Sequence, residues 1–204
     1  MLTVTTAATD LTLLTLAELR SATGVETGRD ADLTALGRRV AAAITHVCRV
    51  PAAGATTPTL RLETLTETFR LKSSQESLVL SRVPIVSITS VVENDETLTA
   101  SDYEIDGLML CRLEDDERST WAAAKIVVVY RAGWATVPDD LRLAAMKLAA
   151  SYWTEETREP GLRSEEIPGV YSASYQDKES DNPAIPFDVM QLLEVGGYVR
   201  RWVG

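Results

Sequence analysis

Histidine and cysteine are scarce in this 204-residue chain, which has one of the first and two of the second. His46 stands near the end of a predicted helix with no second ligand beside it, so a structural role is expected. Cys48 and Cys111 are too far apart in the sequence for a zinc-binding pair, and free thiols in a reducing cytoplasm are expected. The sequence also lacks a glycine-rich phosphate loop and a Gly-x-Ser-x-Gly elbow. It therefore predicts no catalytic, cofactor-binding or metal site.

Long apolar runs and clustered basic residues are also missing. No run approaches the roughly 20 apolar residues of a membrane-spanning helix, and no membrane contact is expected. No basic residue precedes Arg20, so a secretory signal is not expected. The formal net charge is −10, whereas DNA-binding proteins neutralise phosphates with clustered Lys and Arg. Sequence-specific DNA binding is therefore disfavoured. The negative net charge suits a protein past which DNA slides without adhering.

Acidic residues occur in short clusters, of which residues 114–117 (Glu-Asp-Asp-Glu) form the densest. Such a cluster attracts divalent cations, but it lacks the alternating ligands and the turn glycine of a calcium loop. We therefore predict a solvated, charged loop over residues 114–118. The acidic pairs at 155–156 and 165–166 receive the same interpretation.

Two amphipathic helices are predicted in residues 1–57. The first starts from a cap at Thr9 or Asp10, ends at about Ala22 before Gly24, and has an apolar side. That side consists of Leu13, Leu16 and Leu19.

The second helix is predicted from Asp30 or Asp32 to about Arg49, because Val50-Pro51 stops it. Its apolar residues recur at helical spacing on one face. These are Leu33, Leu36, Val40, Ile44 and Val47.

Residues 58–132 change to a period of two, which predicts an antiparallel β region. Leu60 and Leu62 alternate with charged residues, and Leu65 breaks the phase, which suggests a bulge or kink. Hairpin turns are predicted at residues 93–96 and at Asp106-Gly107. Further strands are predicted at 77–80, 83–92 and 126–130, the second with Pro84 near its start.

Residues 133–158 predict a turn at Gly133 followed by a long helix. Pro138 suits the first helical turn, and Asp139 and Asp140 suit the positive end of the helix dipole. An apolar stripe continues to about Trp153. Its members are Leu141, Ala144, Ala145, Leu148 and Tyr152.

Residues 159–204 predict an extended C-terminal arm, irregular as far as Pro186 and then carrying a short helix that ends at Gly196-Gly197. The arm ends in residue types that are enriched at interface hot spots. We predict a partner-docking set, with docking on the chain's own domain as the alternative. The set is Leu192, Leu193, Tyr198, Arg200, Arg201 and Trp202.

The fold expected from these segments is α+β, a small helical bundle with an inserted antiparallel β region. Residues 102–110 (DYEIDGLML) and 127–149 (VVVYRAGW, then VPDDLRLAAMKLA) resemble the head–tail connector proteins of tailed bacteriophages and related gene-transfer particles. The resemblance is clearest over residues 84–153 and rests on packing motifs. The β region is longer than in short family members, so the resemblance does not give its strand order.

The resemblance implies a structural virion protein without enzymatic activity or cofactor. Its subunits would form a ring, commonly of twelve, beneath the portal protein in the neck, after assembly in the bacterial cytoplasm. The ring would extend the DNA channel, with only non-specific passage of DNA, and offer a surface to the next neck or tail component. Alternatives are a stopper or tail-completion protein, an uncharacterised hydrolase, and a small DNA-binding regulator. Deleting the residues after Pro186 is expected to abolish portal binding and leave the rest folded.

Overall fold

The computed structural model describes residues 1–157, 164–167, 171–174 and 185–199. The chain divides into two compact units whose segments interleave. The β unit comprises residues 1–11 and 50–136, and the helical unit comprises residues 12–49 and the described residues from Val137 onward. These described residues contain four α-helices and antiparallel sheets, so the fold is α+β, as predicted.

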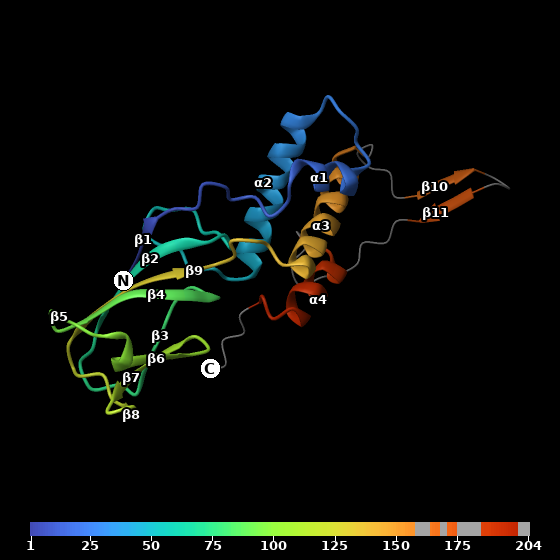
Figure 1. Cartoon of the computed structure of the whole chain (residues 1–204). Helices are drawn as coiled ribbons and strands as arrows, with labels where there is room; N and C mark the ends of the chain where they lie inside the picture. Colours follow the sequence, from blue (N-terminus) through green and yellow to red (C-terminus); the bar gives the residue numbers. More distant parts are fainter. Residues whose placement is uncertain (158–163, 168–170, 175–184, 200–204) are drawn as a thin grey trace. The chain divides into compact units, whose positions relative to one another are not determined.

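A five-stranded antiparallel sheet in the order β1-β2-β9-β4-β5 forms one layer of the β unit (Figure 1). Its central strand β9 is apolar and β-branched, which suits a position between two neighbours. The strands are β1 (Leu2–Thr6), β2 (Glu63–Arg70), β9 (Lys125–Ala132), β4 (Ile85–Glu93) and β5 (Glu96–Thr97). The strand β1 lies in a segment for which only helices were predicted, and it pairs along β2.

A smaller antiparallel sheet in the order β3-β7-β6, with β8 paired to β7, forms the second layer. Its elements are β3 (Ser77–Val79), the 3₁₀ turn η1 (Ala100–Asp102), β6 (Tyr103–Asp106), β7 (Met109–Glu114) and β8 (Glu117–Ser119). Apolar side chains of both sheets pack together in one core. Its buried members include Leu65, Leu78, Leu110, Trp121, Ile126, Val128 and Tyr130.

Within the β unit, three hairpin turns join neighbouring strands. The predicted turn at residues 93–96 is confirmed, with positive φ at Asn94 and Asp95, and Gly107 turns between β6 and β7 with φ 62°. Residues 114–117, predicted as a solvated loop, form a third tight hairpin between β7 and β8. Asp115 and Asp116 have φ of 52° and 67° there, because a short aspartate side chain tolerates the left-handed region.

The phase break at Leu65 is not a bulge, since β2 pairs with β9 without interruption from residue 63 to residue 70. Glu63, Leu65 and Glu67 alternate inward together and all three are buried. The prediction was wrong because it assigned the charged positions to the solvent face. The register shifts lie elsewhere, in β1 opposite β2 and in β4 opposite β9.

Gly133 ends β9 with φ 102°, in a region that side chains rarely adopt. A Cβ at this position would lie 2.3 Å from the Arg61 carbonyl oxygen. The neighbouring Trp134 exchanges backbone hydrogen bonds with Leu60 and Leu62. The predicted turn at Gly133 is therefore confirmed and also permits a close backbone crossing.

The helical unit contains α1 (Leu16–Thr23), α2 (Asp30–Val47), α3 (Asp139–Thr157) and α4 (Phe187–Val195). The start predicted for the first helix was wrong. Thr15 caps α1, because its side chain accepts from the Glu18 amide while Glu18 accepts from the Thr15 amide. Gly24 ends α1 in the left-handed conformation.

The long helix α3 packs against α1, α2 and α4. The predicted stripe is buried as far as Leu148, and Trp153 then continues it while Tyr152 is half-buried. Strands β10 (Ser164–Ile167) and β11 (Tyr171–Ser174) form an antiparallel hairpin in the segment predicted to be irregular.

Candidate partner-docking surfaces

The predicted docking residues occupy different environments. Leu193 is fully buried in α4, Leu192 is half-buried, and the Tyr198 hydroxyl donates a 2.6 Å hydrogen bond to Oδ1 of Asp140. Arg200, Arg201 and Trp202 lie outside the described residues. For Leu193 and Tyr198, the structure thus shows contacts within the chain's own helical unit.

The helix α4 belongs to the core of the helical unit. Ile185 and Val189 are buried together with Leu193, and α4 packs against α3. Deleting the residues after Pro186 would remove Val189 and Leu193 from that core, so the helical unit would not stay intact. A truncation that tests the arm must therefore remove only the residues after Val199.

Two polar contacts fix α4 antiparallel to α3. Near the start of α4, Asp188 accepts a 3.0 Å hydrogen bond from Lys147, while beyond its end Tyr198 reaches Asp140 near the start of α3. The Lys147 contact lowers the pKa of Asp188 despite partial burial. Burial, together with the hydrogen bond to Asp140, raises the pKa of Tyr198.

An exposed apolar seam follows from this antiparallel arrangement. Leu143 lies one turn before Lys147 on α3 and is 46% exposed, and Val195 lies two turns after Asp188 on α4 and is 83% exposed. Leu192 lies one turn before Val195 on α4 and is half-buried. We call Leu143, Leu192 and Val195 the α3–α4 seam, and it retains one of the predicted docking residues at the surface.

The β unit contains a buried polar cluster that sequence reasoning missed. The Glu67 carboxylate accepts hydrogen bonds from the Ser81 amide at 3.0 Å and from the Tyr130 hydroxyl at 2.9 Å. The Arg82 guanidinium donates to the carbonyl oxygens of Pro51 and Thr59, at 3.0 and 2.7 Å. These contacts attach the segments around residues 51–59 and 81–82 to the inward face of the sheet.

The same guanidinium faces Glu63, with Nη1 of Arg82 3.4 Å from Oε2 of Glu63. Burial raises the pKa of Glu63, and the positive charge of Arg82 opposes this shift. Carboxylates with a tyrosine and an arginine are a set that active sites also use. Here Glu63 and Arg82 are 3% and 4% exposed, so a substrate has no access and the cluster is structural.

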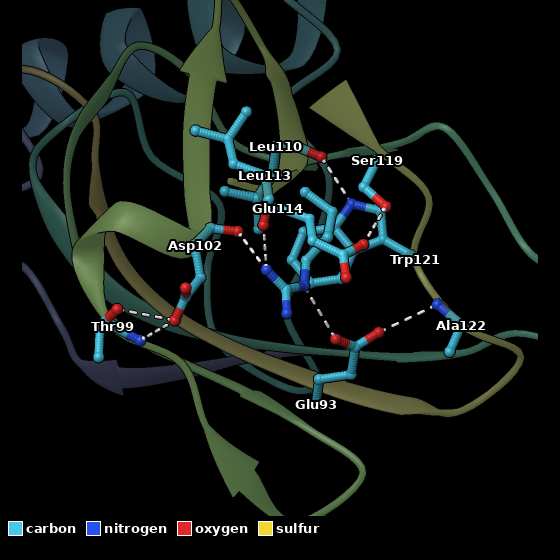
Figure 2. Close-up of polar contacts among 10 residues, drawn as sticks. Glu93, Thr99, Asp102, Leu110, Leu113, Glu114, Ser119, Trp121 and Ala122 are labelled. Atoms are coloured by element: carbon cyan, nitrogen blue, oxygen red, sulfur yellow. Dashed lines mark hydrogen bonds and ion pairs between the residues drawn. The ribbon is translucent and has the colours of Figure 1, made fainter. Parts of the chain in front are cut away.

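A second arginine, Arg112 of β7, connects the two sheets of the β unit. Arg112 donates to Glu93 at 3.1 Å and to the Asp102 carbonyl at 2.8 Å. Figure 2 shows the other Glu93 oxygen accepting from the Ala122 amide, at 3.0 Å, and the indole of Trp121 donating to the Leu110 carbonyl. The arrangement clamps β4 of the large sheet to β7 of the small sheet.

The remaining reactive residue types are dispersed. His46 is exposed on α2, while Cys48 and Cys111 are buried, and burial raises the pKa of the Cys48 thiol to about 12. Within the described residues, no three His, Cys, Asp or Glu side chains converge on a point where a metal ion would fit. The helices of that same portion are too short or too polar to cross a membrane.

The described residues thus define a structural class of protein, with two folded units, charged groups used for internal clamps, and exposed apolar positions on both units. The sequence matches the head completion protein family over residues 12–195. The chain belongs to the head completion protein family, which is structural rather than enzymatic. The hydrolase and DNA-binding regulator hypotheses are therefore set aside.

Solved structures with a similar fold come from gene transfer agent (GTA) particles. A chain of the virion of a native GTA particle is 23% identical with a TM-score of 0.56, and a chain of the neck of an empty GTA particle, computed with C6 symmetry, is 23% identical with a TM-score of 0.59. A chain of the neck of a native particle, computed with C12 symmetry, is 21% identical with a TM-score of 0.51. Each match covers 100% of this chain and 98% of the other. A comparison with curated proteins finds no similar sequence.

Proposed function

We propose that this head completion protein is a head-to-tail adaptor of a virion neck, where its copies form a ring beneath the portal. The observation that carries the proposal is the family match over residues 12–195, together with full-length similarity of fold to neck chains of GTA particles. The ring extends the channel through which DNA passes and presents a surface to the next neck or tail component. The net charge of −10 supports passage of DNA without adhesion.

The contact with the portal is assigned to the C-terminal arm and the surface beside it. Leu192 and Val195 of the α3–α4 seam are accessible, and Arg200, Arg201 and Trp202 follow with side chains typical of interface hot spots. Leu193 and Tyr198 act indirectly in this proposal, because they hold α4 on α3. Each contact is weak on its own, and repetition around a closed ring makes the attachment firm.

The test is reconstitution of the purified protein with the portal of the same particle, followed by imaging and by measurement of bound protein. A variant that ends at Val199, and Leu192→Ser with Val195→Ser, are expected to lose portal binding with unchanged circular dichroism. The matched control is Leu11→Ser, at an exposed leucine of the β unit that does not belong to the seam. Full binding by the truncated variant and by the double variant would remove the arm from the proposal.

The order of addition separates an adaptor from a stopper or tail-completion protein. An adaptor binds the portal directly, whereas a stopper binds only after another neck protein is in place. Absence of the protein from the neck of purified particles would reject both roles.

A further inference from the structure

The face of the five-stranded sheet that points away from the core has an unusual composition. The strand register places Thr64, Thr66, Thr68 and Arg70 of β2 opposite Arg131, Val129, Val127 and Lys125 of β9. These residues alternate with the buried ones, and all are half-buried or exposed. With Ser87, Ser90 and Val92, which pair with β9 on the same side, they make up what we call the basic sheet face.

Carboxylates are absent from the basic sheet face, whose strands the structure describes in full, although the chain has 30 acidic residues. Its cations are Arg70, Lys125 and Arg131. Arg70 and Lys125 lie directly opposite each other, and like charges in a cross-strand pair are destabilising. None of the three makes an ion pair with any residue of the described parts of the chain.

The small sheet presents a complementary surface on the opposite side of the β unit. Leu78 and Leu110 point into the shared core, so their neighbours in the strands point outward. Val79 is 56% exposed there, and Leu108 of the adjoining turn is 45% exposed. Glu104 and Asp106 share one cation, Arg118. The acidic turn of residues 114–117 closes the β7–β8 hairpin of the same sheet. We call these residues together the acidic sheet face.

We propose that the basic sheet face of one copy binds the acidic sheet face of the next copy. The inference rests on the ring of the proposed function and names the contact that builds it. A ring needs head-to-tail contacts between two different surfaces of each subunit. These two faces qualify because they lie on the two outer sides of a two-sheet stack and differ in charge. Carboxylates of the neighbour would relieve the repulsion between Arg70 and Lys125.

The apolar content favours a protein partner over nucleic acid. Val127 and Val129 on the basic face, and Val79 on the acidic face, are half-exposed or exposed. Sheets that stack face to face bury such side chains between them. A phosphate backbone would meet the cations and leave the valines in contact with water.

Crosslinking tests the contact in particles assembled with variant protein. Val79→Cys and Val129→Cys are introduced separately and together, and a short bis-maleimide reagent joins exposed thiols. Unmodified chains are the control for Cys48 and Cys111, which are buried. The double variant is expected to give a ladder of crosslinked oligomers, and a mixture of the single variants a dimer, whereas each single variant alone gives monomer.

Charge reversal supplies the second measurement. Arg131→Glu is expected to reduce the ladder at least tenfold, Asp106→Arg to reduce it likewise, and the two combined in one chain to restore it. Arg38→Glu, an exposed arginine on α2, is the control and should leave the ladder unchanged. If the double-cysteine variant is present in necks but gives no ladder of crosslinked oligomers, this contact is wrong, and the adaptor role still stands. Duplex DNA binding that Arg131→Glu abolishes, again without a ladder, would overturn it in favour of nucleic acid.

Discussion

Replacing Gly133 by alanine is expected to destabilise the β unit more than any other glycine-to-alanine change there. The added Cβ would lie 2.3 Å from the Arg61 carbonyl oxygen and 2.8 Å from its carbon, so backbone has to move. The positive φ of 102° costs about 1–3 kcal/mol for a residue with a side chain. Movement also weakens hydrogen bonds from Gly133 to Pro84 and between Trp134 and Leu60, each contributing about 1 kcal/mol.

The expected loss is therefore about 3 kcal/mol or more in the free energy of unfolding. Urea denaturation followed by circular dichroism measures it, and hydrogen exchange of the β2 and β9 amides shows where it acts. Gly107→Ala is the matched control, because Gly107 also has positive φ and a Cβ there meets nothing within 4 Å. A difference below about 0.5 kcal/mol between the two variants would refute the clash, since surface substitutions have effects of that size.

Three further perturbations test the other structural assignments. Arg82→Met leaves Glu63 buried without its cation and is expected to cost about 3–5 kcal/mol in urea denaturation; a cost near zero would contradict a structural cluster. Leu193→Ala, at a fully buried position, is expected to cost about 2–5 kcal/mol, whereas Leu192→Ala costs less because Leu192 is half-buried; equal effects would contradict the packing of α4. Partial burial raises the pKa of Glu18, but the Thr15 hydrogen bonds and Arg142 outweigh it and lower this pKa below 4.5. The stabilising contribution of the Glu18 carboxylate is therefore present above pH 4.5 and is lost as the pH falls through the lowered pKa. Glu18→Gln should then flatten the pH dependence of the melting temperature below pH 4.5.

The helices and the hairpin turns were accessible from sequence because local chemistry determines them. The apolar spacing of α2, the Pro138-Asp139-Asp140 start of α3 and the Asp106-Gly107 turn each act within a few residues. The start of α1 was misplaced because Thr9, Asp10 and Thr15 are all competent caps, and only the capping box with Glu18 distinguishes the third.

The buried glutamates could not be predicted, because their partners come from distant segments. Glu63 and Glu67 are stabilised inside by Arg82, Ser81 and Tyr130. The hydrophobic pattern of β2 does not indicate these contacts. The prediction of the docking residues was limited in the same way. Composition drew attention to the tail, but the burial of Leu193 depends on how α4 packs against α3.

The interleaving of the two units has a consequence for synthesis on the ribosome. The polypeptide passes from one unit to the other after residues 11, 49 and 136. The β unit therefore has all its strands once Thr136 has emerged, whereas α1 and α2 must wait for α3, and α3 in turn must wait for α4. Each new subunit would therefore complete its sheets before its helical unit, and the α3–α4 seam would form only after α4 has been synthesised.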